Sequence, residues 1–400
     1  MIGGEKMKIY KSFVTRCYTT PEQEIYLQKC FGVARYIYNI CVNKYLESKE
    51  KKKYLNKTEL YDIVKKEIKD KEWLSDVNRS VIDNALRDFY NKKEQFWTKI
   101  KNGEESSFHY RSKKEFNSCE YHRKKHNTFQ IINKNNISIL KKREPGKKFA
   151  PRFILKTREN LNRFNENGNR IQRVCIFKKN GIYYINLVYE TKTKFQNINT
   201  NNKLKVGIDM GIKTSMTLFD SNNDIKEYKI PLKKLRRQNC KVNKKNCFLL
   251  RKKYGSKGYL KALSKFHKAQ TRFNNMKKDW IEKTTSEIVN KYDEIIIEPY
   301  DFSLNKTKVK YKAGRISRIE VSGYTILKRL KDKANLNNKK LFEVPKYRKT
   351  TQRCSCCGNI LEGSDKLKIY NREYKCKICG NIMDRDVNAA KNILNYFEWN

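Results

Sequence analysis

Apolar residues recur at helical spacing through much of the first hundred residues. This periodicity predicts amphipathic helices over 22–48, 57–71 and 75–102. The apolar stripe of the third helix consists of Val81, Ala85, Leu86, Phe89, Phe96 and Trp97. Residues 170–191 instead alternate between apolar and polar positions, as paired strands do. We therefore expect a mixed helical and β arrangement in the N-terminal half, where no catalytic signature is found.

In the C-terminal half, short apolar runs typical of buried strands accompany a long helical stretch. Strands are predicted at 204–209, 214–219 and 294–298, and residues 264–292 repeat apolar side chains at helical spacing. Near the C-terminus a further helix carries Val387, Ala390, Ile393 and Leu394 on one face. The whole chain, at 400 residues, is long enough for two or three domains with their own cores.

The net charge of the chain indicates what kind of partner it binds. Lysine and arginine total 91 against 42 acidic residues, a formal net charge of +49. Such self-repulsion favours a polyanionic partner, and nucleic acid is expected; a lysine-rich proteome accounts for part of the surplus, and a membrane surface is the other anionic candidate. No signal peptide, lipidation motif or membrane-spanning apolar run is seen, so a soluble cytoplasmic protein without a membrane partner is expected.

The twelve cysteines are unevenly distributed. Seven are scattered singly, and each of these is expected to be a small buried or half-buried hydrophobic residue: Cys17, Cys30, Cys41, Cys119, Cys175, Cys240 and Cys247. The other five lie between residues 354 and 379. Without a secretory context, this crowding favours a metal or redox site over disulfides.

The crowded cysteines form two CxxC pairs, Cys354/Cys357 and Cys376/Cys379, with eighteen residues between the pairs. A glycine follows each pair and permits the tight knuckle that points two thiolates in one direction. Two such knuckles complete a tetrahedral Zn²⁺ site, so we predict one structural zinc ion in a zinc ribbon. A redox-active CxxC is the alternative, but the thioredoxin-like βαβ pattern is missing. The role of Cys356 stays open.

Three acidic residues stand out from the basic background. Asp209 ends the strand-like run Val-Gly-Ile-Asp, Glu298 follows three isoleucines, and Asp386 precedes the last helix in DRDVNAAKNIL. Each has an ordinary explanation, as a turn residue, a strand-end surface residue and a helix cap. Together they are the makings of a carboxylate cluster that holds two Mg²⁺ or Mn²⁺ ions for phosphodiester hydrolysis. Asp384 is the second choice for the last position.

These motifs, in this order, resemble the TnpB family, the RNA-guided endonucleases encoded by insertion sequences, and the related miniature type V CRISPR effectors. The resemblance rests on VGIDMGIKT, EIIIEPYDF, KTTQRCSCCGN and the stretch from Cys376 to Leu394, and extends over essentially the whole chain. It implies a split RuvC-like nuclease of RNase H type with an inserted zinc ribbon, in which Asp209, Glu298 and Asp386 are the catalytic acids.

The resemblance also implies a multidomain α+β and α/β fold. A wedge-type β-barrel would occupy 1–30 and 126–202, and a helical recognition lobe 31–125. The RuvC-like nuclease would occupy 203–345 and 381–400, with the zinc ribbon at 346–380. The expected partners are a guide RNA and double-stranded target DNA, with a short flanking motif beside the target. A CRISPR effector and a non-cleaving RNA-guided repressor remain alternatives, and the oligomeric state is left open.

Overall fold

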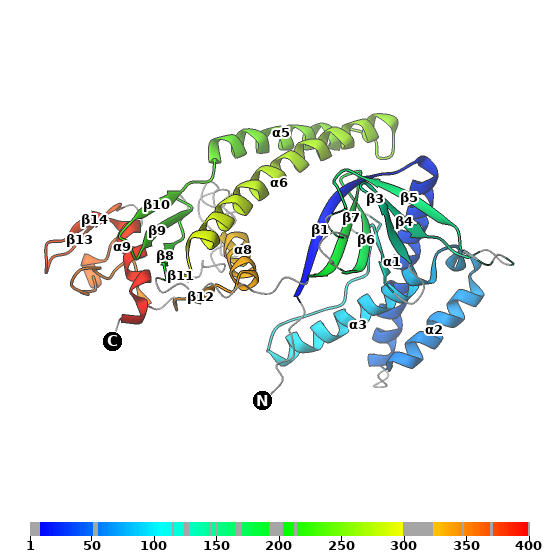
Figure 1. Ribbon diagram of the computed structural model, residues 1–400, viewed down its shortest axis with the longest axis horizontal. Helices are drawn as coiled ribbons and strands as arrows, with labels where there is room; N and C mark the ends of the chain where they lie inside the picture. Colours follow the sequence, from blue (N-terminus) through cyan, green and yellow to red (C-terminus); the bar gives the residue numbers. More distant parts are fainter. Residues whose placement is uncertain are drawn as a thin grey trace. The chain divides into compact units, whose positions relative to one another are not determined.

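The computed structural model divides the chain into two compact units, Met1–Thr193 and Lys194–Asn400 (Figure 1). It describes residues 9–50, 55–113, 116–123, 128–143, 146, 148, 150–162, 164, 170–191, 203–211, 214–298, 323–345, 348–368 and 371–398.

The first unit is built on an antiparallel seven-stranded sheet with the order β2-β6-β7-β1-β5-β4-β3. Its strands are β1 (Ile9–Tyr18), β2 (Ser118–His122), β3 (Phe129–Asn133), β4 (Asn136–Leu140), β5 (Arg152–Thr157), β6 (Arg170–Lys179) and β7 (Ile182–Thr191). Asn180 and Gly181, both with positive φ, form the two-residue turn between β6 and β7. The strand pair predicted over 170–191 is therefore confirmed.

Three helices accompany this sheet, α1 (Pro21–Glu50), α2 (Lys57–Asp70) and α3 (Arg79–Lys101). A short 3₁₀ helix, Glu72–Asp76, links α2 to α3. The helices and the sheet share one hydrophobic core, to which the stripe of α3 contributes Val81, Ala85, Leu86 and Phe89. The three predicted helices are confirmed, with the start of the last one shifted to Arg79.

The second unit contains a mixed five-stranded sheet with the order β10-β9-β8-β11-β12. The strands are β8 (Lys205–Asp209), β9 (Met216–Asp220), β10 (Ile225–Tyr228), β11 (Glu294–Ile297) and β12 (Lys340–Glu343). The first three are antiparallel neighbours, whereas β8, β11 and β12 run parallel to one another. Because β8, β9 and β11 are almost fully buried, they have the continuous apolar runs that predicted them.

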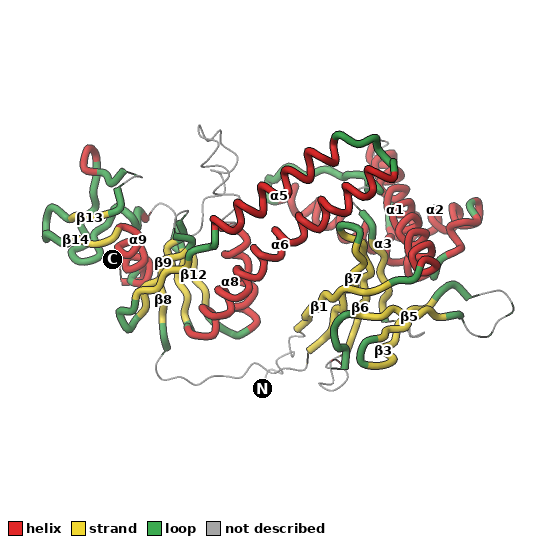
Figure 2. The backbone as a smooth tube through the Cα atoms, turned by 90° about the horizontal axis from the view of Figure 1, so that it is seen from above, coloured by secondary structure: helices red, strands yellow, loops and turns green. Residues whose placement is uncertain are grey.

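Helices α5 (Leu232–Leu250), α6 (Lys257–Lys291) and α8 (Gly323–Leu336) belong to the same unit. Figure 2 shows α5 and α6 side by side as an antiparallel pair. The buried face of α6 near its C-terminal end, with Ile281, Ile288 and Val289, packs into the core of the sheet. The helix predicted at 264–292 is confirmed and is longer at its N-terminal end.

The C-terminal segment adds a small two-stranded sheet and a helix. Strand β13 (Glu373–Lys375) pairs with β14 (Ile382–Asp384), and α9 (Arg385–Leu394) follows directly. Helix α9 packs on β8, β9 and β11. Its approach is close because Gly207 of β8 has no side chain: a Cβ there would lie 2.2 Å from the Ala390 carbonyl oxygen and 2.5 Å from the Leu394 nitrogen.

The scattered cysteines correct one expectation. Cys17, Cys30, Cys41 and Cys119 are buried and Cys175 is half-buried, as predicted, but Cys240 and Cys247 are exposed. Both exposed cysteines lie on α5, whose buried positions are Leu235, Gln238, Val242 and Leu249. A cysteine's burial is therefore decided by the face of the helix on which it lies.

The described helices include none that is both long and apolar enough to cross a bilayer.

The four predicted domain segments stay a prediction, because the division into two units is coarser than they are.

The glycine contact between β8 and α9 generates a prediction about stability. Gly207→Ala would place a methyl group against helix backbone that cannot rotate away, and we expect a loss of about 1–3 kcal/mol of unfolding free energy. Gly258→Ala in α6 is the matched control, because its Cβ would meet nothing closer than 3.8 Å and alanine favours helices. Chemical unfolding of both variants is the measurement; equal stabilities would contradict the close contact.

Candidate metal centres

Asp209 and Glu298 arrive at the same edge of the five-stranded sheet. In the parallel pair of β8 and β11, Ile208 lies opposite Ile297, so the next residues along both strands are the two acids. Two residues before the acids, Gly207 and Ile296 lie opposite each other, and both face α9. Because side chains on a strand alternate, Asp209 and Glu298 extend from that same face. Both acids are half-buried.

Asp386 reaches this edge from α9. The helix lies over Gly207 at Ala390 and Leu394, and Asp386 is one turn nearer the helix N-terminus than Ala390. The step from Ala390 to Asp386 is about one helical turn, or about 5.4 Å along the helix, and the step from Gly207 to Asp209 is about 6.6 Å along the strand. The two steps are therefore similar in length. Asp386 is thereby brought close enough to Asp209 for the two carboxyls to act on each other. Asp384 has a different task, since it caps α9 by accepting the backbone N–H groups of Asp386 and Val387.

Neighbouring charges at this edge shift the pKa values of Asp209 and Asp386. Burial, followed by the nearby Asp386 and Glu298, raises the pKa of Asp209 to about 8. Burial and the neighbouring Asp384 also raise the pKa of Asp386, while Arg372 opposes the shift through an ion pair with an Nη1–Oδ2 distance of 3.3 Å. Repulsion between partly desolvated carboxylates of this kind is relieved when a cation binds between them.

The three acids are not packed as ligands of a single ion. Among the described residues, they form no group in which one oxygen from each lies within 4.8 Å of the others. A two-ion site does not require such a group, because its ions are about 4 Å apart and its outer ligands need not meet. The donor set, carboxylate oxygen only, suits Mg²⁺ or Mn²⁺.

Two residues at this edge were missed by sequence reasoning. Thr350 donates its hydroxyl hydrogen to Glu298 Oε2, and Arg372 pairs with Asp386. Both come from the segment between β12 and α9. Neither belongs to a local pattern that points to an acid elsewhere in the chain, so no signal in the sequence identifies them.

The four predicted zinc ligands form the second centre. The sulfur atoms of Cys354, Cys357, Cys376 and Cys379 lie within 4.8 Å of one another. The cross-knuckle Sγ–Sγ distances are 3.7 Å for Cys354 and Cys379 and 3.5 Å for Cys357 and Cys376. A tetrahedral zinc ion with Zn–S bonds of about 2.3 Å requires sulfurs about 3.8 Å apart. The cluster therefore fits a structural zinc ion.

The two cysteine knuckles have the same backbone pattern. The carbonyl of Cys354 accepts the N–H of Gly358 and that of Cys376 accepts the N–H of Gly380, at 3.0 and 3.1 Å. Both glycines have positive φ, 75° and 69°, which a side chain would disfavour. Cys356 is exposed and contributes its backbone N–H to Cys354 Sγ, while its thiol is outside the group of four.

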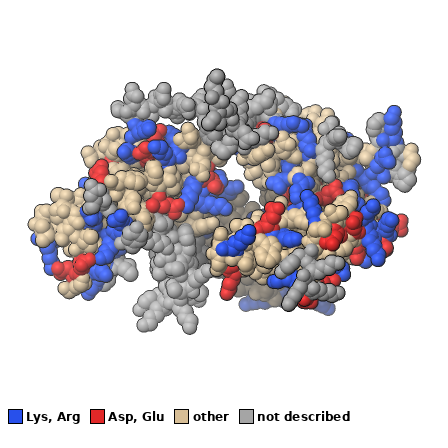
Figure 3. All heavy atoms as spheres, turned by 90° about the horizontal axis from the view of Figure 1, so that it is seen from below, with Lys and Arg blue, Asp and Glu red and all other residues tan. Residues whose placement is uncertain are grey.

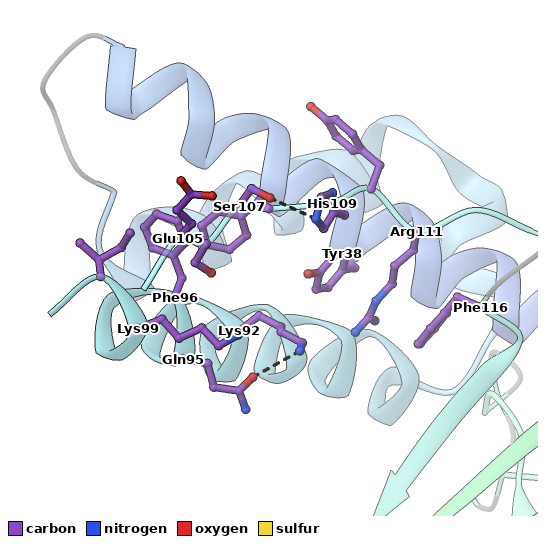
Figure 4. Close-up of a pocket in the computed structure, with 14 residues that line it drawn as sticks. Tyr38, Lys92, Gln95, Phe96, Lys99, Glu105, Ser107, His109, Arg111 and Phe116 are labelled. Atoms are coloured by element: carbon purple, nitrogen blue, oxygen red, sulfur yellow. Dashed lines mark hydrogen bonds between the residues drawn. The ribbon is translucent and has the colours of Figure 1, made fainter. Parts of the chain in front are cut away.

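The first unit has a pocket between α1, α3 and the segment after α3, with a volume of about 920 Å³. Figure 4 shows Tyr38 from α1, and Lys92, Gln95, Phe96 and Lys99 from α3, around it. The Arg111 guanidinium lies 3.6 Å from the ring centre of Tyr38 and 3.9 Å from that of Phe116, and it pairs with Asp88. The wall thus combines aromatic rings with cationic side chains.

Lysine and arginine side chains are spread over the face drawn in Figure 3, with fewer acidic groups between them. This distribution is the surface expression of the net charge of +49.

Three family models match the chain. They are described as the "Helix-turn-helix domain" of OrfB_IS605 for residues 7–53, "Probable transposase" (OrfB_IS605) for 186–305, and "Cas12f1-like, TNB domain" for 324–393. The described part of 7–53 consists of strand β1 and helix α1, so a second helix of a helix-turn-helix is not seen there.

Similar proteins come from a giant virus and from bacteria. "Putative transposase R186" of Acanthamoeba polyphaga mimivirus is 30% identical over 48% of this chain, which covers only 39% of that protein. "Putative RNA-guided DNA endonuclease InsQ" of Escherichia coli (strain K12) is 21% identical over 97% of this chain and 92% of its own length.

The same fold occurs in a solved structure, the "Cryo-EM structure of the Cas12f1-sgRNA-target DNA complex". The likeness has a TM-score of 0.60 and covers 97% of this chain and 99% of that one, at 15% identity. It shows a shared mixed α/β multidomain fold. The family models and the relatives thus make this chain similar to TnpB-like proteins and to proteins named RNA-guided DNA endonucleases.

Proposed function

We propose that this protein is an RNA-guided DNA endonuclease associated with a transposable element and acting inside the cell. The observation that carries the proposal is the convergence of Asp209, Glu298 and Asp386 at one edge of a mixed sheet, with the ionisation of Asp209 coupled to both other acids. The mixed sheet with flanking helices supports an RNase H-like RuvC core. The names of its relatives support the same activity.

The three acids would share two Mg²⁺ ions between them. When bound, the ions supply an activated water and charge stabilisation for the leaving oxygen of a DNA phosphodiester. Half-buried Asp209 would hold the ions from the end of β8, Glu298 from the end of the next strand, and Asp386 from α9. Arg372 restrains Asp386, so that this carboxylate keeps its position between reactions. The chemistry requires no covalent nucleophile.

Selection of the target would be delegated to base pairing between a guide RNA and DNA. In this arrangement the protein reads the shape of the hybrid and a short flanking motif. We assign these contacts to the first unit, as a wedge-type β-barrel with a helical recognition lobe. The net charge of +49 supports contact with phosphates over a large surface. The similar solved structure, a Cas12f1-sgRNA-target DNA complex, contains both kinds of partner.

The pocket beside α3 suits a nucleotide of this partner. Its volume of about 920 Å³ exceeds the size of one base with its sugar and phosphate, and its walls carry the half-buried Phe108 and the exposed Tyr110 for stacking. Lys92 and Lys99 supply cations for the phosphate. We assign single-stranded nucleic acid to it.

A miniature CRISPR effector is the second candidate, and the likeness to a Cas12f1 complex favours it specifically. The catalytic chemistry would be identical in both cases. Sequencing the RNA that co-purifies with the protein separates them, because a transposon-end RNA and a repeat-derived RNA differ in sequence. A non-cleaving repressor is disfavoured by the presence of all three acids.

The first prediction from this proposed function concerns catalysis. Asp209→Ala removes the carboxylate at the centre of the acid cluster, and we expect cleavage of supercoiled target plasmid to fall by more than the factor of about 10–100 that residues orienting a metal ligand contribute. Asp279→Asn on α6 is the control, because that aspartate is exposed and pairs only with Lys283 among the described ion pairs. A variant Asp209→Ala that still cleaves at the wild-type rate would refute the assignment.

The second prediction concerns pH. Because the fold raises the pKa of Asp209 from 3.8 to about 8, its ionised form destabilises the metal-free protein increasingly as pH rises from about 4 to 8. Asp209→Asn should therefore raise Tm at pH 8 in buffer without added Mg²⁺ or Mn²⁺ and have little effect near pH 4. Added Mn²⁺ should stabilise the wild type more than the variant. Thermal unfolding across this range is the measurement, and a variant less stable at pH 8 would contradict it.

The third prediction concerns zinc. Cys376→Ser removes a buried member of the sulfur cluster, so bound zinc measured by mass spectrometry should fall from about one ion per chain to near zero. Cys356→Ser is the matched control one residue from a knuckle ligand, and it should retain its zinc because its thiol is outside the cluster. Equal zinc contents in the two variants would show that the four sulfurs do not bind the ion together.

A further inference from the structure

The backbone segment that enters the cysteine ribbon, residues 349–355, is attached to α9. Asn392 donates from Nδ2 to the carbonyls of Thr350 and Arg353, at 2.8 and 2.7 Å. Asn388, one turn earlier, donates from Nδ2 to the Arg353 carbonyl at 2.7 Å, and its Oδ1 accepts the Ser355 N–H at 2.9 Å. The segment is thus held to the helix by two neighbouring side chains.

Both asparagines are almost fully inaccessible to water, Asn388 at 0% and Asn392 at 2% exposed. A buried amide that loses its hydrogen-bond partners destabilises the fold, so these contacts define one position of the segment against α9. Lys349, with φ of +49°, makes the turn that brings the next residue into place. The backbone position of Thr350 is therefore fixed by these contacts and does not depend on what its side chain contacts.

The side chain of Thr350 is 2% exposed and donates its hydroxyl hydrogen to Glu298 Oε2. Glu298 follows the short strand β11, and its extra methylene gives its carboxylate more rotational freedom than that of an aspartate. A β-branched side chain on a fixed backbone is restricted at χ1 and can hold such a group in one orientation. A hydrogen bond to a carboxylate is also stronger than one between neutral groups.

We propose that Thr350 is a positioning residue for the Glu298 carboxylate and that Asn392 holds Thr350 for this task. The inference rests on the proposed metal-dependent nuclease, in which Glu298 is a ligand. The hydroxyl fixes one carboxylate oxygen, and therefore the plane of the carboxylate, relative to Asp386 on the same helix as Asn392. The Glu298 side chain is therefore already restricted in the folded protein, so it would lose less conformational entropy when it binds a cation.

The alternative is that Thr350 only satisfies a buried polar group. In that case its removal would change stability without changing the affinity of the acids for a cation. The two roles are therefore separated by metal affinity measured beside stability.

The experiment compares Thr350→Val, which keeps the shape and removes the donor, with Thr350→Ser, which keeps the donor. Thr284→Val is the matched control, because Thr284 is also buried but donates to the Trp280 carbonyl within α6. Two quantities are measured on the full chain: the Mn²⁺ concentration that half-maximally raises Tm of the RNA-free protein, and the Mn²⁺ concentration for half-maximal plasmid cleavage with bound guide RNA.

We expect Thr350→Val to raise both Mn²⁺ midpoints about tenfold, in line with residues that orient metal ligands. Thr350→Ser should return them towards wild-type values, and Thr284→Val should leave them unchanged. Wild-type midpoints in a folded Thr350→Val variant would overturn the role of Thr350 and leave the nuclease proposal intact. A wild type that neither cleaves nor responds to Mn²⁺ would overturn both.

Discussion

The contact between α9 and Gly207 is the constraint on which the acid site depends. Helix and strand backbones meet there without a side chain between them, at a distance that a methyl group would make impossible. The contact fixes the distance between α9 and β8. It thereby also fixes the position of Asp386, which lies one turn before Ala390 on the same helix. A side chain at position 207 would push the helix away from the strand and hold the carboxylates further apart.

Bringing the acids together is unfavourable until a cation arrives. Burial alone raises the pKa of Asp209, and Asp386 and Glu298 raise it further. Removing water from around a carboxylate and adding like charges both oppose its ionisation. The arrangement that suits a divalent ion therefore destabilises the folded protein when no ion is bound. The general basic surface does not relieve this, because exposed charges beyond about 8–10 Å are screened by salt.

Much of the fold and the site follows from local sequence. Strands β8 and β11 are buried on both faces, so their continuous apolar runs predict them from the sequence. An acid directly after such a run is expected at the edge of the sheet. The cysteine pairs are recognisable because a metal knuckle needs fixed spacing and a glycine. Thr350 is different: its partner is 52 residues away, and threonine is common in buried and exposed positions alike. The exposure of Cys240 and Cys247 likewise depends on which face of α5 packs.

The order of elements along the chain makes α9 common to both candidate metal centres. The chain leaves the sheet after β12, forms the cysteine ribbon and returns through β14 directly into α9, where Asp384 caps the helix. Asn388 and Asn392 then bind the first knuckle's entry segment back to the same helix. The ribbon is therefore attached at its start and at its end to one short helix of ten residues. Such a helix is marginal alone, so a closed ribbon restricts its freedom and stabilises the position of Asp386.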